Sequence, residues 1–333
     1  MKNYIFTALI FFSSMFKVGC DAFVVSNDTS TQEPEKFSQE MIPQTRNGRL
    51  MFESKSDFHT YTEFLIENQN PSYLDKVEAG LKDFVSLRTA TNQLIFQEGM
   101  DDGNQNNLRI VEDIVLESVL NSNGEIQIAD SIYKITHDYV YMVDHQESDL
   151  LSDIYLRSAG SSNLTQHTSV QVFEIDRSVT SGTLPKSSNA MAIQSPGECW
   201  GYFPVPDNDD RKFRMKGSLW INNWWIYRSF GTELESQQIR KRGWFRRWFH
   251  NEAKFIKISG KFSVKALNSH DQLYTGTRHF NFTKSNAAEI RHTFRKDRNN
   301  EVKGANIQAT FYVFKGATDK DHSTCSSTRS WRW

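Results

Sequence analysis

The distribution of tryptophan and charge divides this chain into two regions with different expected roles. All eight tryptophans lie within residues 197–333, and this region holds 25 Lys and Arg against 13 Asp and Glu, a net charge of +12. Residues 1–196 hold the other 14 Lys and Arg against 27 Asp and Glu, a net charge of −13. A chain of 333 residues has room for one large or two modest domains. The asymmetry predicts two.

The acidic region combines helical and strand periodicity. Apolar residues at helical spacing predict three helices, over residues 57–65, 72–81 and 108–120. Alternating segments then predict strands over residues 125–128, 131–136 and 139–143. These elements form a small α+β unit. A Ser- and Thr-rich stretch follows it, with one strand over residues 169–175.

The basic region is predicted to be all-β. Its aromatic and β-branched residues alternate with polar ones, which is typical of a sandwich-like pair of sheets. The expected strands cover residues 212–215, 218–228, 255–267, 277–282 and 307–314. Residues 287–295 are the exception, because their spacing also suits a helix.

The fold class expected is therefore α+β, with a small N-terminal helix-plus-hairpin unit followed by an all-β sandwich-like C-terminal domain. The boundaries that follow are a signal peptide (1–20), a flexible tether (21–46), a small α+β domain (47–157), a Ser/Thr-rich linker (158–198), a β-rich basic domain (199–325) and a tail (326–333).

The first twenty residues have the composition of a secretory signal. Lys2 precedes an apolar core over residues 5–16 that is too short to span a bilayer. Gly19-Cys20 is similar to a bacterial lipobox, in which the cysteine receives a diacylglycerol, although Lys17 departs from the usual aliphatic residue. Cleavage after Ala22 is the alternative. We expect export, with Cys20 as a lipid anchor that holds the protein on a membrane.

Two further cysteines lie in the basic region. In an oxidising envelope Cys199 and Cys325 can form a disulfide, with Cys325 reaching Cys199 from a polar tail. Two free thiols are the alternative. A metal site is not expected, because only two thiols remain and no histidine stands at ligand spacing.

Residues 239–250 (IRKRGWFRRWFH) interleave cations with aromatic rings. Arg and Lys neutralise polyanions while rings stack on bases or sugars, so this pattern predicts a ligand surface. The candidate residues are Trp220, Trp224, Arg240, Arg242, Trp244, Arg246, Arg247 and Trp248. If Trp220 and Trp224 lie in one strand, they share a face and Trp225 takes the other. The alternatives are that the rings pack in the core, or that the basic segment docks on the acidic region.

The sequence has no catalytic signature. It contains no His-Glu-x-x-His, no Gly-x-Ser-x-Gly and no phosphate-binding Gly-x-x-x-x-Gly-Lys. Two acidic loops, residues 101–104 and 207–210, lack the spacing of a helix-loop-helix calcium site. We therefore expect no cofactor and no catalytic residue, and an exported protein is not expected to bind nucleic acid.

Several segments resemble uncharacterised exported lipoproteins of Bacteroidota. The matching segments are residues 47–52, 57–65, 124–136, 213–220, 226–231 and 243–248. The resemblance implies an outer-membrane or cell-surface location and this two-part architecture, and it carries no catalytic residues.

Three functions follow from these features. The first is a non-enzymatic cell-envelope lipoprotein that binds a glycan, acidic for charge reasons, or a protein. The second is a structural or accessory component of an envelope complex. The third is an envelope hydrolase, which would need a deep pocket with two facing carboxylates.

Overall fold

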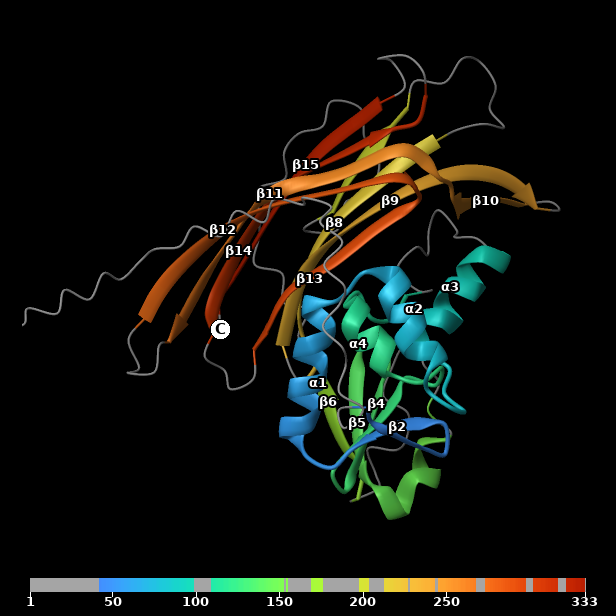
Figure 1. The fold of residues 1–333 in the computed structure, drawn as a ribbon, viewed down its shortest axis with the longest axis vertical. Coiled ribbons are helices and arrows are strands. Elements are labelled where there is room, and N and C mark those ends of the chain that lie inside the picture. The colour runs from blue at the N-terminus through green and yellow to red at the C-terminus, as the bar shows by residue number, and fades with distance from the viewer. Residues whose placement is uncertain are drawn as a thin grey trace, which may run out of the picture.

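The computed structural model describes residues 42–98, 109–152, 154, 169–175, 198–203, 213–226, 228–242, 245–267, 273–297, 302–316 and 322–332. The signal segment with Cys20, the two acidic loops and most of the expected linker lie outside these ranges. The described chain is mostly β, in three sheets (Figure 1). Within it, no helix has both the length and the apolar character needed to cross a membrane.

The first sheet belongs to the N-terminal unit. In sheet order its strands are β1 (Gln44–Arg46), β2 (Arg49–Phe52), β3 (Glu125–Ile128), β4 (Ser131–Ile135), β5 (Tyr139–Asp144) and β6 (Gln171–Glu174). Asn47 and Gly48 both have positive φ, as a tight two-residue hairpin turn between β1 and β2 requires. The strands predicted within residues 125–143 are confirmed. The strand predicted over residues 169–175, within the Ser/Thr-rich stretch, is confirmed as β6, and β1 lies inside the segment predicted as a tether.

Helices cover one face of this sheet. They are α1 (Lys55–Glu67), α2 (Pro71–Ala79), α3 (Leu87–Glu98) and α4 (Ile114–Val119), and a 3-10 helix, η3 (His145–Leu151), lies against the other face. The Oγ atom of Ser54 accepts the Asp57 N–H at 3.1 Å, which caps α1, and α2 starts with Pro71. The first two predicted helices are confirmed.

The third predicted helix is wrong in length. Only six residues form α4, because the Asp113 carboxylate accepts the N–H groups of Val115 and Leu116 and so fixes the helix start. The preceding residues, 109–113, are not helical. The sequence reading also missed α3, whose buried positions include the polar residues Arg88 and Thr91. These residues break the apolar periodicity that a helix prediction needs.

The basic region forms a β-sandwich. Its second sheet has the order β10 (Phe245–His250), β9 (Arg228–Arg242), β8 (Phe213–Asn223) and β7 (Glu198–Tyr202), and β13 (Glu289–Asp297) pairs with β9 beyond β10. The third sheet has the order β12 (Leu273–Ala287), β11 (Ala253–Leu267), β14 (Val302–Phe314) and β15 (His322–Arg332). Met215, Leu234, Ile258 and Phe311 lie in the apolar core between the two sheets.

Three details of the basic region differ from the prediction. Residues 289–297 form β13 and not a helix, because Ile290 and Phe294 pack into the sandwich while Glu289 and Arg291 point the other way. Residues 213–223 form one strand where two were expected. Residues 326–332 are no tail, since they complete β15 against β14.

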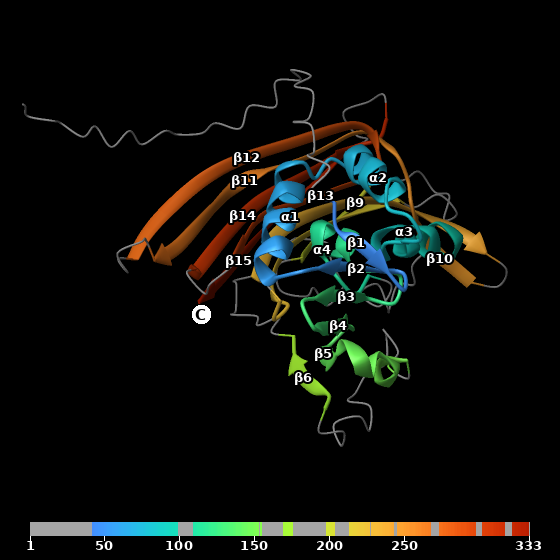
Figure 2. The same cartoon turned by 60° about the horizontal axis from the view of Figure 1, so that its bottom comes forward.

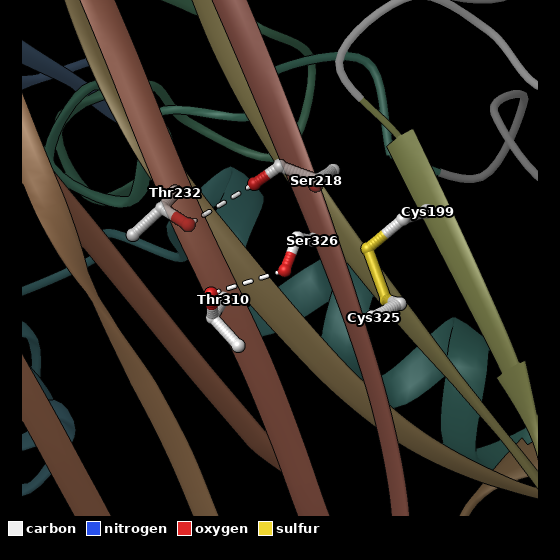
Figure 3. The surroundings of a disulfide bond; sticks show 6 residues. All are labelled: Cys199, Ser218, Thr232, Thr310, Cys325 and Ser326. Atoms are coloured by element: carbon white, nitrogen blue, oxygen red, sulfur yellow. Dashed lines mark hydrogen bonds between the residues drawn. A yellow bond between two sulfur atoms is a disulfide. The ribbon is translucent and has the colours of Figure 1, made fainter. Parts of the chain in front are cut away.

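Cys199 and Cys325 form a disulfide, the first of the two alternatives that the sequence left open (Figure 3). Their Cα atoms are 5.9 Å apart, across 126 residues of sequence. Cys199 lies in β7 of the second sheet and Cys325 in β15 of the third. The bridge therefore joins the two sheets of the sandwich from within regular strands, and not from a mobile tail.

The molecule is built in successive layers. Figures 1 and 2 show the third sheet, the second sheet, the helices and then the first sheet. The second sheet thus has the sandwich core on one face and the helices on the other. Trp224, in the turn after β8, packs into the apolar core of the N-terminal unit. The two regions of the sequence therefore share a buried interface.

Candidate functional site

The helix-facing side of the second sheet is polar and buried. On β9, Leu234 points into the sandwich, so its neighbours Glu233 and Glu235 point toward the helices. Glu289 and Arg291 do the same on β13, where Arg291 lies opposite Glu233 and Glu289 opposite Glu235. Isolated buried charges are very costly, so each of these groups needs a partner.

Two arginines and three glutamates supply these partners. The Arg109 guanidinium is 2.7 Å from the Glu117 carboxylate, 3.3 Å from that of Glu289 and 3.6 Å from that of Glu233. Arg291 is 2.5 Å from the same Glu117 carboxylate and 3.5 Å from Glu233. Glu117 belongs to α4, so this cluster joins α4 to β9 and β13.

A second set of contacts extends the network along the sheet. Lys216 is 3.2 Å from Glu198, and the Nε2 atom of His250 is 3.3 Å from the Glu235 carboxylate. Arg214 donates to the Gln237 side chain at 2.6 Å and lies over the Trp248 ring at 3.8 Å from its centre. We call all of these residues, with the arginine–glutamate cluster, the buried charge network.

Burial and charge move the pKa values of the network in opposite directions. Burial, with the nearby Glu235, raises the pKa of Glu233 to about 8, despite Arg109 and Arg291. For Glu235, burial is outweighed by the hydrogen bond from His250 and by the charge of Lys216, so its pKa is lowered. The contact with Glu235 raises the pKa of His250 against the effect of burial. Burial and charge therefore favour the protonated form of Glu233 and the ionised form of Glu235.

A pocket of about 900 Å³ opens beside this network, between α3 and the second sheet. Its lining residues come from α2, α3, β9, β10, β12, β13 and the short segments between strands: Pro71, Asn92, Ile95, Phe96, Gln97, Arg240, Phe249, His250, Asn251, Glu252, Lys284, Ala288 and Glu289. His250 and Glu289 belong to both the pocket and the network. This size is typical of sites for small ligands.

The pocket lining combines cations with an exposed aromatic ring and side-chain amides. Arg240 is exposed and lies over the Phe249 ring, 5.7 Å from its centre. Burial lowers the pKa of Lys284, although the charge of Glu289 opposes the shift. Phe96 is 85% exposed at the pocket edge. Such a lining can bind an anionic group, hydrogen-bond hydroxyl groups and offer a ring face to a sugar.

The predicted tryptophans that the structure describes do not form an exposed surface on which a sugar could stack. Trp220, Trp224 and Trp248 are 3%, 0% and 4% exposed, so none of them offers a ring to a large ligand. Trp224 and Trp225 follow β8 in a turn, so Trp220 and Trp224 are not strand neighbours on one face. Trp225 is 51% exposed, but its ring contacts that of Phe173, with ring centres 4.5 Å apart.

The predicted arginines have different positions. Arg240 lines the pocket, and Arg247 donates to the Glu98 carbonyl at the end of α3, at 3.1 Å. Arg242 and Arg246 lie in the paired strands β9 and β10, and their side chains are outside the described residues. Trp244 and Cys20 also lie outside them. The structure therefore brings Arg240 and Arg247 to α3, where Trp248 packs against Ile95.

Sequence reasoning missed most of the pocket. Asn92, Phe96 and Gln97 lie on α3, which was not predicted, and Lys284 and Glu289 lie far away in sequence. The alternation Glu289-Ile290-Arg291 was the one available signal, because it is typical of a strand. Among the described residues, no group of three or more His, Cys, Asp or Glu is arranged to hold a metal ion.

No protein-family model matches the chain, and no curated protein matches it significantly. The functional argument therefore depends on the geometry of the site.

Proposed function

We propose that this protein is a non-enzymatic cell-envelope lipoprotein, exported and anchored through Cys20, that binds an acidic glycan in the pocket between α3 and β9. The observation that supports it is the pocket lining, which combines basic side chains with side-chain amides and an exposed phenylalanine ring. The outer membrane or cell surface is the proposed location.

The charge of the lining favours an anionic ligand. Arg240, Lys284 and His250 bring groups that can carry positive charge to the pocket, Glu252 and Glu289 bring carboxylates, and burial disfavours the charged form of Lys284. The guanidinium groups of Arg109 and Arg291 offset the negative charge of Glu289 and lower its pKa against the effect of burial. A carboxylate on the ligand would favour the charged form of Lys284 and pair with the Arg240 guanidinium.

The same contacts favour binding over hydrolysis. Glu252 and Glu289 both line the pocket, so the hydrolase alternative has two carboxylates available. A general acid needs a raised pKa, and the lowered pKa of Glu289 is unsuited to that role. The carboxyl with the raised pKa, Glu233, is not among the lining residues. Product analysis after long incubation with the bound glycan would reveal hydrolysis if it occurred.

Calorimetric titration of the full mature chain with a uronic-acid oligosaccharide tests the proposal. We expect binding that weakens with salt, and no binding of the matching neutral oligosaccharide. Arg240→Ala should lower the affinity at least about tenfold, since hydrogen bonds to charged groups contribute about 1.5–3 kcal/mol. Arg46→Ala is the matched control, because Arg46 is also exposed but lies on β1.

Equal affinity of the two variants for the oligosaccharide would contradict the proposal that the pocket binds it. No binding by the unaltered chain, together with co-purification of a fixed protein partner, would favour the structural or accessory alternative instead.

A further inference from the structure

The outward side of the third sheet has an unusual composition. Alternate residues of its four strands point into the sandwich, as Ile256, Ile258 and Val264 do on β11. The outward positions are the odd-numbered residues 255–265 and 275–285 and the even-numbered residues 306–314 and 322–330. We call these 22 positions the outer face.

The outer face contains no Asp or Glu, although these make up 40 of the 333 residues of the chain. Eleven of its positions are Ser or Thr and three are Asn or Gln. The others are Lys257, Lys261 and Lys265, two histidines and three aromatic residues. A strand surface that only needed to be soluble would carry both signs of charge. This composition therefore points to a ligand.

The strand register arranges these residues in rows across the sheet. One row runs from Asn281 on β12 through Ser259 and Thr310 to Ser326 on β15. Neighbouring rows have the same polar character, and adjacent strands are about 4.8 Å apart. The rows thus form a continuous grid of hydrogen-bonding groups over four strands.

Hydroxyl groups in the grid are oriented by their neighbours. The Oγ1 atom of Thr310 and the Oγ atom of Ser326 are 3.0 Å apart (Figure 3), and the hydroxyls of Ser263 and Thr277 are 3.1 Å apart. Each hydroxyl has one donor and two acceptor positions, so a cross-strand pair keeps free capacity toward solvent. Oriented hydroxyls match the hydroxyl groups of a polysaccharide.

Three lysines add positive charge to the outer face. Lys257, Lys261 and Lys265 recur every four residues on β11, which spaces them about 13 Å apart along one strand. None of them forms an ion pair with another residue in the described ranges. The row therefore fits a long ligand with regularly repeated negative charge.

The aromatic residues lie together at one end of the face. Phe255 and Tyr312 have ring centres 6.0 Å apart, and the Tyr312 and His322 rings stack at 5.7 Å. All three aromatic side chains of the face are half-buried, and none of the large exposed apolar residues of the described chain lies there. Membrane insertion needs such residues, so the face suits a polar polymer better than a lipid surface.

We propose that the outer face binds an acidic polysaccharide along the row of lysines. The ligand class rests on the proposed function, but the site is separate, because the pocket lies on the other side of the second sheet. The lysines pair with the repeated carboxylates, and the hydroxyls and amides of neighbouring rows hydrogen-bond the sugar hydroxyls.

Binding of the full mature chain to immobilised polygalacturonate tests this proposal, with neutral dextran as the reference polymer. The triple variant Lys257→Gln, Lys261→Gln and Lys265→Gln should lose at least tenfold in affinity. The control triple variant Lys55→Gln, Lys76→Gln and Lys82→Gln removes the same charge from exposed positions in the helical region and should bind as the unaltered chain does. Equal affinity of the two triple variants would overturn the proposal.

Two further measurements separate this proposal from the pocket. Arg240→Ala should still bind polygalacturonate while losing the short oligosaccharide. If Arg240→Ala abolishes binding of both ligands, the pocket alone binds the polymer and the proposal for the outer face is wrong. If the unaltered chain binds the short oligosaccharide but not the polymer, the outer face fails and the pocket stands. Co-sedimentation with anionic vesicles but not with polygalacturonate would also overturn the proposal.

Discussion

The two faces of the second sheet belong to the same strands, yet they are held by different interactions. Toward the third sheet, Met215 and Leu234 pack in an apolar core. Toward the helices, their direct neighbours Lys216, Glu233 and Glu235 are also buried, but their side chains contact the polar partners Glu198, Arg291 and His250. Apolar burial needs no particular geometry, whereas a buried charge is tolerated only with its partner in place.

This difference separates the part that stabilises the fold from the part that forms the site. Buried ion pairs contribute little net stability compared with apolar packing. The sandwich, with its disulfide, therefore supplies the stability of the basic region. The charge network fixes the position of α4 and the electrostatics of the pocket.

The largest expected effect concerns the disulfide of the sandwich. Cys199→Ser with Cys325→Ser removes a bridge across 126 residues. The loop-entropy estimate is roughly 5 kcal/mol of unfolding free energy, as an upper value. Denaturant unfolding of the variant and of the unaltered chain, with and without reductant, measures it. Reductant should destabilise only the unaltered chain, and an unchanged midpoint in the double variant would show that the bridge does not support the sandwich.

The next effect concerns the charge network. Glu117→Ala leaves both Arg109 and Arg291 without their closest carboxylate, and breaking a buried pair costs about 3–5 kcal/mol. Denaturant unfolding checks this. Glu67→Ala, at the exposed end of α1, should change stability by less than about 0.5 kcal/mol. If both variants lose a similar amount of unfolding free energy, the buried charge network does not hold α4 in place as described.

The smallest effect is the pH dependence of the network. The pKa of Glu233 is raised to about 8 from 4.5, so the folded protein binds one more proton than the unfolded chain between these values. Its contribution to stability is complete below pH 4.5 and is lost as pH rises toward 8, with a slope of about 1.4 kcal/mol per pH unit. The difference between the unaltered chain and Glu233→Gln should show this slope between pH 5.5 and 8. A difference that is flat with pH, or that rises with it, would show that Glu233 is ionised in the folded protein.

The comparison of the two faces also explains which parts the sequence could predict. Alternation identified residues 255–267 and 307–314 as strands because one of their faces is apolar and the other meets solvent. On β13 both faces are buried, so the charged residues Glu289 and Arg291 were wrongly interpreted as the solvent-exposed face of a helix. Periodicity reports polarity and not burial, so a buried polar face is misread.

The pocket was only partly predictable for a related reason. Arg240 was identified from the local mixture of cations and rings, and it lines the pocket. Trp248 was chosen on the same signal, but it packs under α3 against Ile95 and Ile239. Phe96 and Lys284 have no local signal at all, because only the packing of α3 on the second sheet brings them together.

Hydrogen–deuterium exchange with and without a uronic-acid disaccharide tests the central claim most directly. The claim is that the helix-facing side of the second sheet holds the ligand. We expect slower exchange in the C-terminal part of α3, residues 92–97, and around Asn251 between β10 and β11, with no change in β4 of the first sheet. Protection elsewhere, or no protection in α3 at saturating disaccharide, would contradict it.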